Sequence, residues 1–137
     1  MIDVDFVLTA HRRVAAGGVG LFGGVNEAAL SGALARVAQH RFYVGLDDVF
    51  EIAAFYAVAL ARAHAFSDGN KRTATAVMLA YLDLQGIEFE NADGLDEVMV
   101  QVAAGFLDAS GLAAQLRDFF DAQAESVARS SGELADL

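Results

Sequence analysis

The stretch from residue 64 to residue 73, HAFSDGNKRT, gathers an imidazole, a carboxylate, an amide and two cations within ten positions. Together with Arg62 just before it, the stretch contributes three bases against one acid over residues 62–72. The local charge is therefore +2 (three bases less one acid) inside a chain whose formal net charge is −10. A local cationic patch of this kind attracts an anionic ligand.

A predicted helix start gives this patch its chemistry. Residues 66–69 form a loop that leads into a predicted helix over about 70–84, whose first N–H groups have no partner within the helix. Helix N-termini bind phosphate through those groups and the helix dipole. Gly69 lets a ligand approach the backbone because it has no Cβ. Asn70 and Arg72 lie in the first turn, within reach of the same anion.

Two further side chains add a metal ligand and a base. Asp68 is placed to hold a Mg²⁺ ion, because protein magnesium sites use one or two carboxylates together with substrate phosphates. His64, at the end of the preceding helix, is placed to take a proton from an attacking hydroxyl group. The competing interpretation is a polar turn in which Asp68 caps the helix, the cations are solvated and His64 is satisfied in the core. These residues alone leave both interpretations open.

Helices must position this stretch. The 137-residue chain contains no proline, and its apolar residues recur at helical spacing, so we predict one compact all-α domain over residues 1–125. About six helices are expected, with the active-site loop between two central ones. They cover about 3–15, from 26, 47–64, 70–84, 93–107 and 110–123. The third is apolar all round over 52–61, which indicates a buried central helix, and residues 126–137 are expected to form a flexible tail.

Composition excludes several function classes. The net charge of −10 argues against nucleic acid as a direct partner and against anionic membranes. The longest uncharged stretches, such as residues 14–26, are too short to span a bilayer. The absence of cysteine excludes thiolate chemistry and fits a reducing compartment. Asp3 and Asp5 stand where a secretory signal carries bases, so no targeting segment is predicted and a cytoplasmic protein is expected.

Weaker patterns have simpler interpretations. Residues 18–23 match G-x-G-x-x-G, but no strand precedes them and no acid follows in a βαβ unit, so we predict a connecting loop. His11 and His40 have no second ligand at metal-binding spacing and are interpreted as surface or packing residues. The remaining acids are expected to cap a helix start or to lie in a solvated loop; they are Asp47, Asp48 and Glu51, and Glu88, Glu90 and Asp93.

Residues 64–72 match the motif of the Fic/Doc family, H-x-F-x-[DE]-[AG]-N-x-R, in register. The stretches LFGGVNEAALSGALARVAQH and AYLDLQGIEFE also resemble the corresponding parts of Doc, the death-on-curing toxin branch. The resemblance covers most of residues 1–121 and implies a Fic/Doc-type helical bundle. The matched motif positions are His64, Phe66, Asp68, Gly69, Asn70 and Arg72.

The departures from the family's other branch indicate the reaction. The AMP-transferring Fic motif reads H-P-F-x-[DE]-G-N-G-R-x-x-R, whereas this chain has Ala65, Lys71 and Thr75 at the proline, the second glycine and the second arginine. Lys71 is the Doc-like residue. In that branch the resemblance implies a cation that fills the space of the inner phosphates, so that ATP binds reversed and its γ-phosphate faces the acceptor. The implied activity is that of a protein kinase.

The resemblance also implies a role for each matched residue. His64 is the general base on a Thr or Ser hydroxyl, and Asp68 is the Mg²⁺ ligand. Asn70 and the backbone around Gly69 cradle the nucleotide phosphates, while Phe66 anchors the loop. ATP and Mg²⁺ are the implied substrate and cofactor. The cations that neutralise charge on the transferred phosphoryl group are Lys71 and Arg72.

Partners follow from the same resemblance. It implies a toxin that acts on a translation factor, elongation factor Tu, and an antitoxin that binds in trans. The inhibitory motif of some Fic proteins, [ST]-x-x-x-E-[GN], is absent, and the apolar surface shared by the first and fourth helices is the expected antitoxin site. Residues 39–46 form either a flap that aligns the substrate or an ordinary loop with Phe42 and Tyr43 held in the core.

Two other functions stay open at this point. Gly69 matches the AMP-transferring motif, so nucleotidyl transfer to a protein hydroxyl is one alternative. Ala65 and the high apolar content favour the other alternative, a helical protein-binding module without catalysis.

Overall fold

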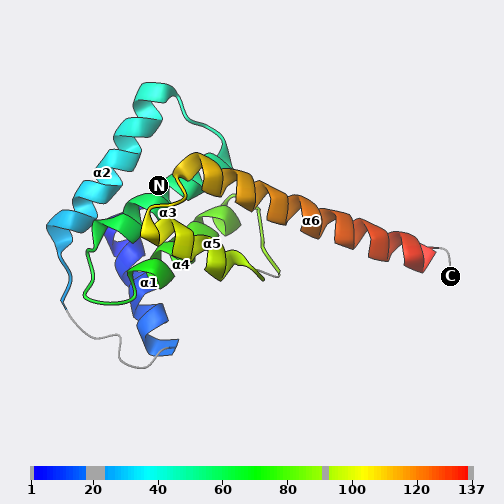
Figure 1. The fold of residues 1–137 in the computed structure, drawn as a ribbon, viewed down its shortest axis with the longest axis horizontal. Coiled ribbons are helices and arrows are strands. Elements are labelled where there is room, and N and C mark those ends of the chain that lie inside the picture. Colours follow the sequence, from blue (N-terminus) through cyan, green and yellow to red (C-terminus); the bar gives the residue numbers. More distant parts are fainter. Residues whose placement is uncertain (1, 18–23, 91–92, 136–137) are drawn as a thin grey trace.

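Six helices build the structure, a computed structural model that describes residues 2–17, 24–90 and 93–135. The predicted all-α class is confirmed, since the only β-type pairing among the described residues is one bridge between Val25 and Phe66. Residues 18–23, with their G-x-G-x-x-G match, lie outside the described residues. The helices (Figure 1) are α1 (Val4–Gly17), α2 (Glu27–Val44), α3 (Val49–Ala63), α4 (Asn70–Leu84), α5 (Leu95–Ala104) and α6 (Ala109–Ala135).

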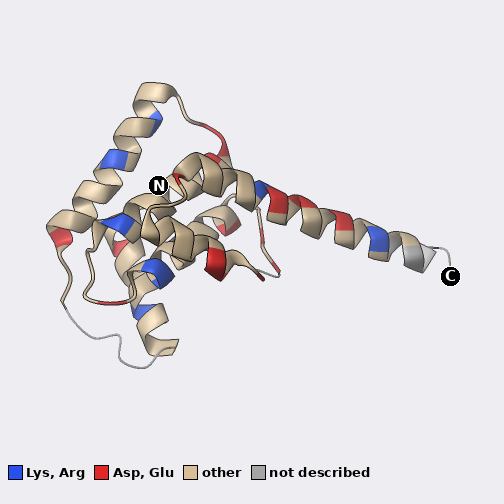
Figure 2. Ribbon diagram, viewed as in Figure 1, with Lys and Arg blue, Asp and Glu red and all other residues tan. Residues whose placement is uncertain are grey.

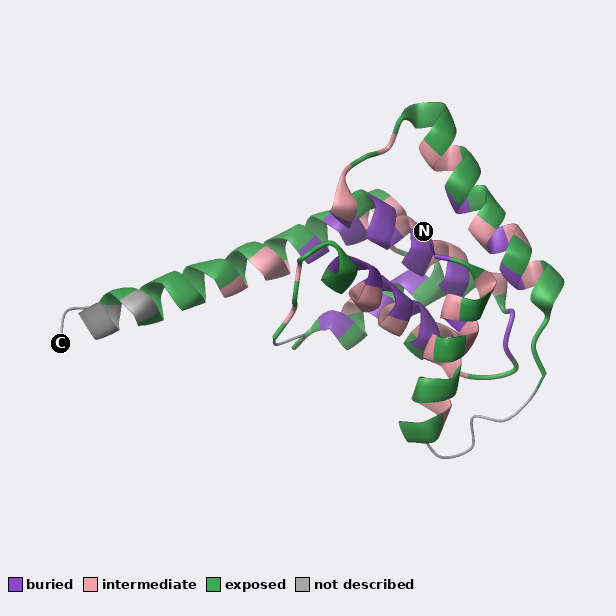
Figure 3. Ribbon diagram, turned by 180° about the vertical axis from the view of Figure 1, so that it is seen from behind, coloured by how far each residue is buried: buried purple, intermediate pink, exposed green. Residues whose placement is uncertain are grey.

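Helix α3 is the central element, as its apolar sequence predicted. It contacts α2, α4, α5 and α6, and Figure 3 shows buried residues gathered on α3 and the elements around it. Four of its buried residues are alanines, which allow neighbouring helices to approach closely. The buried residues of α3 are Phe50, Ile52, Ala53, Ala54, Tyr56, Ala57, Leu60 and Ala61.

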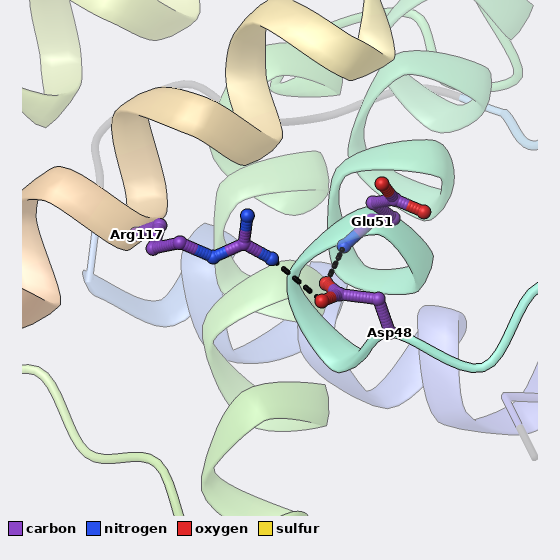
Figure 4. A network of polar contacts seen from close by, with 3 residues as sticks. All are labelled: Asp48, Glu51 and Arg117. Atoms are coloured by element: carbon purple, nitrogen blue, oxygen red, sulfur yellow. Dashed lines mark hydrogen bonds and ion pairs between the residues drawn. The ribbon is translucent and has the colours of Figure 1, made fainter.

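Polar side chains cap two helices as predicted. The Ala29 N–H donates to Asn26 Oδ1 at the start of α2 (3.0 Å), and the Glu51 N–H donates to Asp48 Oδ1 at the start of α3 (3.0 Å). Arg117 of α6 forms an ion pair with the second oxygen of Asp48 (Figure 4). The contact network therefore ties α6 to the start of the central helix.

The bounds of α4 agree with the prediction because both ends carry strong local signals. Gly69 precedes the helix, and Gly86 follows it with φ +83°, a backbone region that favours glycine. The Gly86 N–H donates to the Asp83 carbonyl (3.0 Å) and the Ile87 N–H to the Leu82 carbonyl (2.9 Å). This pair of bonds is a Schellman motif. The four residues predicted to face the core are all buried, namely Val77, Met78, Tyr81 and Leu82.

Helix α6 is longer than predicted. It continues to Ala135 instead of ending near residue 123, and its outer part extends away from the other helices, with residues 124–130 exposed (Figures 1 and 3). The predicted end was wrong because it relied on an apolar period. An exposed helix needs none when helix-forming residues and i,i+4 ion pairs such as Arg129 with Glu125 (3.7 Å) support it. The flexibility expected of residues 126–137 stays a prediction.

The segment 39–46 is also mostly helical. Helix α2 continues through Val44 and ends at Gly45, which has φ +64°. The alternative with Phe42 and Tyr43 held in the core is wrong, since they are 83% and 82% exposed. His40 is the packing residue here, with its ring stacked on Phe55 at 4.1 Å. A role for this segment in substrate alignment stays a prediction.

Within the described ranges, no helix is long and apolar enough to cross a membrane.

Candidate functional site

The predicted site residues from His64 to Arg72 meet in one pocket at the junction of α3 and α4. The pocket has a volume of about 470 Å³, and α5 contributes one residue to its wall. The end of α3, the connecting turn and the first turn of α4 thus carry all five residues predicted to be catalytic. The lining residues are Ala61, His64, Ser67, Asp68, Gly69, Asn70, Lys71, Arg72 and Ala103.

His64 has a strained backbone. It ends α3 with φ 50° and ψ 40°, in the left-handed region, and within the described part of the chain it is the only residue other than glycine with a positive φ. This conformation costs an ordinary L-residue on the order of 1–2 kcal/mol. It ends the helix at the pocket and leaves the imidazole exposed there, so the interpretation of His64 as a core histidine is wrong.

The start of α4 has no side-chain cap. Gly69 is the N-cap residue with φ 78°, and no side chain accepts a hydrogen bond from the first turn. The predicted alternative of Asp68 as the N-cap is therefore wrong. Asp68 Oδ1 instead accepts from the Gly69 N–H at 2.8 Å. The second carboxylate oxygen makes no hydrogen bond or ion pair within the described residues.

Asn70 closes the loop on itself. Its Nδ2 donates to the Phe66 carbonyl (2.8 Å), and its Oδ1 accepts from the Phe66 N–H (3.1 Å). Both ends of the amide are thus engaged with the backbone four residues earlier. The observed hydrogen bonds of the Asn70 side chain stabilise the loop. Its role in holding phosphate stays a prediction.

Two cations stand at the pocket without acidic partners. Lys71 is half-buried and Arg72 is exposed, and neither forms an ion pair within the part of the chain that the structure describes. Their positive charge lies at the positive end of the α4 dipole, where it is unfavourable unless an anion binds. Acidic side chains are concentrated elsewhere, notably along α6 (Figure 2).

Arg62 belongs to the local charge count but not to the pocket. Its Nε donates to the Val102 carbonyl (3.4 Å), and another guanidinium nitrogen donates to the Leu107 carbonyl (3.1 Å). Arg62 therefore holds the end of α5 and the turn that follows it. The cationic character of the pocket comes from Lys71 and Arg72.

The start of α2 supports the loop from outside. Val25 pairs with Phe66 in an antiparallel bridge, and the Asn26 N–H donates to the Ala65 carbonyl at 2.7 Å. The Phe66 ring is only 6% exposed, which confirms its predicted role as the anchor of the loop.

His11 contacts the loop in a way that its sequence position did not indicate. Its ring stacks on Phe66, with centroids 3.8 Å apart and planes 8° apart, and its Nδ1 lies 3.0 Å from Thr73 Oγ1. Burial lowers the pKa of His11 below its usual 6.5, while the charge of Asp68 acts in the opposite direction. Of the two predicted interpretations, surface or packing residue, the second holds for His11, but no local spacing links α1 to the motif.

Comparisons with known proteins identify the family of the chain. Residues 1–82 match the Fic/DOC family. The chain is 37% identical over 97 residues to "Protein kinase doc" of Escherichia phage P1, across 71% of this chain and 74% of that protein. It is also 38% identical over 64 residues to "Toxin Doc" of Mycolicibacterium smegmatis, across 44% of this chain and 49% of that protein.

The chain belongs to the Fic/Doc family, as its motif predicted. Both relatives carry the Doc name, which assigns the chain to the Doc branch. The motif loop over residues 64–72 lies inside the matched range.

Proposed function

We propose that this protein is a Doc-like toxin that transfers the γ-phosphate of ATP to a Thr or Ser hydroxyl of a translation factor and thereby arrests translation. The observation that carries the proposal is the uncapped start of α4, with two unpaired cations beside a strained histidine and a carboxylate. The relative named a protein kinase supports the same reaction.

The residues present fit a magnesium–nucleotide complex. Unpartnered N–H groups and unpaired cations suit phosphate, and an exposed carboxylate with one uncommitted oxygen suits Mg²⁺. Asp68 would hold the ion, and the backbone after Gly69 would hold the phosphates with Asn70, Lys71 and Arg72. When bound, Mg²⁺ supplies positive charge to the phosphate oxygens.

The proposed transfer forms one bond to phosphorus, breaks another and moves one proton. The acceptor hydroxyl oxygen forms a bond to the γ-phosphorus, and the bond from that phosphorus to the β–γ bridging oxygen breaks, which releases ADP. His64 takes the hydroxyl proton. Lys71 and Arg72 neutralise charge on the phosphoryl oxygens during the transfer, where most of the catalysis in such reactions arises.

Nucleotidyl transfer is the second candidate because Gly69 matches the AMP-transferring motif. Lys71 argues against it, because a lysine side chain at the pocket fills space that a glycine leaves for phosphate. The two reactions differ in which phosphate of ATP reaches the acceptor. A binding module without catalysis is the third candidate.

The test is a transfer assay with Mg²⁺, a bacterial translation extract and ATP labelled at either the γ or the α phosphate, with His64→Ala as a parallel. The proposal expects γ label in a protein band and none with His64→Ala. Label from the α phosphate instead would establish nucleotidyl transfer. No label from either position would support the binding module. Purified elongation factor Tu in place of the extract tests the expected target.

An antitoxin is proposed to bind in trans on the surface shared by α1 and α4. A cavity of about 600 Å³ lies there, with mostly apolar walls. An amphipathic helix is a suitable occupant, since such helices place an apolar face in a groove of this kind. The activity is proposed for the cytoplasm, where translation factors and ATP are both present. The cavity is lined by Asp3, Asp5, Phe6, Thr9, Ala10, Arg13, Val14, Ala76 and Ala80.

A further inference from the structure

One side chain of α1 contacts the motif from behind. The His11 ring stacks face to face on Phe66, with a centroid distance of 3.8 Å. The same ring makes a hydrogen bond of 3.0 Å to the Thr73 hydroxyl in the first turn of α4. A single imidazole thus contacts one residue before and one residue after the stretch that lines the pocket.

The hydrogen bond with His11 gives the buried Thr73 hydroxyl a partner. Thr73 is 1% exposed and, tyrosines aside, is the only polar or charged residue among the described ones that is buried. Buried hydroxyls need a partner, because leaving one unpaired costs free energy. An imidazole nitrogen and a hydroxyl can pair in either direction, since each is able to donate or accept.

The two contacts lie on either side of the continuous segment that lines the pocket, residues 67–72. Residues 67–72 lie between Phe66 and Thr73, and the Asn70 amide closes the loop onto Phe66. Because Phe66 and Thr73 both contact one ring of α1, that ring constrains where the backbone of residues 67–72 lies relative to α1. His11 itself is not part of the pocket wall, so it acts through other residues.

We propose that His11 is a positioning residue for the transfer reaction, holding the loop through its stack on Phe66 and its hydrogen bond to Thr73. The inference rests on the proposed function for the identity of the reaction. The placement of the loop, however, is measurable without any activity.

The kinetic expectation follows from geometry. Small displacements of positioned groups cost up to about a hundredfold in rate. Replacement of His11 by Leu is therefore expected to lower kcat by about ten- to a hundredfold, while the KM for ATP changes by less than about threefold, because the cations still attract the phosphates.

Two conservative variants separate the contacts. His11→Phe retains an aromatic ring for Phe66 and loses the hydrogen bond, whereas His11→Gln retains a polar partner for Thr73 and loses the ring. Each is expected to recover part of the kcat lost in His11→Leu. In the His11→Phe background, Thr73→Val is expected to have little further effect, since the bond is already absent.

Val7→Ala is the matched control. Val7 is a fully buried residue of the same helix that lines neither the pocket nor the α1–α4 cavity. Its truncation is expected to lower the melting temperature and leave kcat per folded molecule unchanged. Equal losses of kcat in Val7→Ala and His11→Leu would overturn the proposal, because they would show that His11 contributes only to the overall stability of the fold.

A second readout uses the nucleotide-free protein. In ¹H–¹⁵N spectra, His11→Leu is expected to shift or broaden the Gly69 and Asn70 amide signals, and Val7→Ala is not. Unchanged loop signals in His11→Leu would overturn the positioning role. Shifted signals in a protein whose wild type transfers no label would support that role while overturning the proposed function.

Discussion

At the scale of single residues, the imidazole of His64 is proposed to serve activity, whereas its left-handed backbone lowers stability. A left-handed conformation is costly for residues with a Cβ and easy for glycine. We predict that His64→Gly is more stable than His64→Ala by about 1 kcal/mol, and that both variants transfer no label. Urea unfolding of the two variants measures the difference. Equal unfolding free energies would show that the backbone at residue 64 carries no strain.

His11 gives stability a dependence on pH. Its folded-state pKa lies below 6.5, so the unfolded chain binds the proton more readily. The free energy of unfolding is therefore expected to fall as the pH drops below about 6.5, and the full contribution of the neutral ring is present above that pH. Urea unfolding at pH 7.5 and pH 5.5 measures this, with His11→Gln as the control. A pH dependence that is the same in both proteins would contradict the assignment to His11.

At the scale of elements, the junction of α6 with α3 depends on Arg117. Its guanidinium pairs with the α3 cap Asp48 and lies 5.4 Å from the centre of the Phe50 ring. An exposed ion pair and a cation–π contact each contribute up to about 1 kcal/mol. We predict that Arg117→Ala lowers the free energy of unfolding by about 1 kcal/mol, as measured by urea denaturation.

Arg129 is the matched control for Arg117. It also forms an ion pair, with Glu125 of the same helix. Both partners are more than two-thirds exposed, and Arg129 makes no cation–π contact among the described residues. Arg129→Ala is expected to change the unfolding free energy by less than about 0.5 kcal/mol. Equal effects of the two substitutions would mean that the α6–α3 contact gives no special stability.

The cavity between α1 and α4 is the second element-scale prediction. Ala76 lies on its wall, so Ala76→Glu would place a carboxylate in the groove proposed for the antitoxin. We predict at least about tenfold weaker antitoxin binding by calorimetry, because burying a carboxylate against the apolar face of the antitoxin costs more than about 1.4 kcal/mol. Transfer activity is expected to persist.

The control for Ala76→Glu is Leu84→Glu, at an exposed residue of the same helix that lines none of the described cavities. It is expected to leave antitoxin binding unchanged. If Leu84→Glu weakens binding as much as Ala76→Glu, the antitoxin recognises the overall charge of the chain and not this groove.

At the scale of the whole molecule, the sequence predicted the features that depend on local interactions. The bounds of α4 follow from Gly69 and Gly86, and the central position of α3 follows from its apolar surface. The length of α6 was not predicted, because its outer part relies on helix propensity with no buried face. The helical extension of α2 to Val44 was missed for a similar reason, since its aromatic residues are exposed.

The candidate site also has a part that the sequence predicted and a part that only the folded structure shows. The motif residues are contiguous from the end of α3 to the first turn of α4, so they lie close together, and their spacing was readable in the sequence. His11 acts from α1 through a stack and a hydrogen bond that only tertiary packing creates. The engagement of Asn70 with Phe66 is likewise a property of the folded loop.

The intact mass of the acceptor protein tests the central claim most directly. Elongation factor Tu, or the acceptor found in the extract, is incubated with this protein, ATP and Mg²⁺, and its mass is measured before and after. The account predicts a gain of one phosphoryl group that disappears with His64→Ala. A gain equal to AMP, or a phosphoryl gain that persists in His64→Ala, would contradict the assignment of this pocket as a γ-phosphate transfer site.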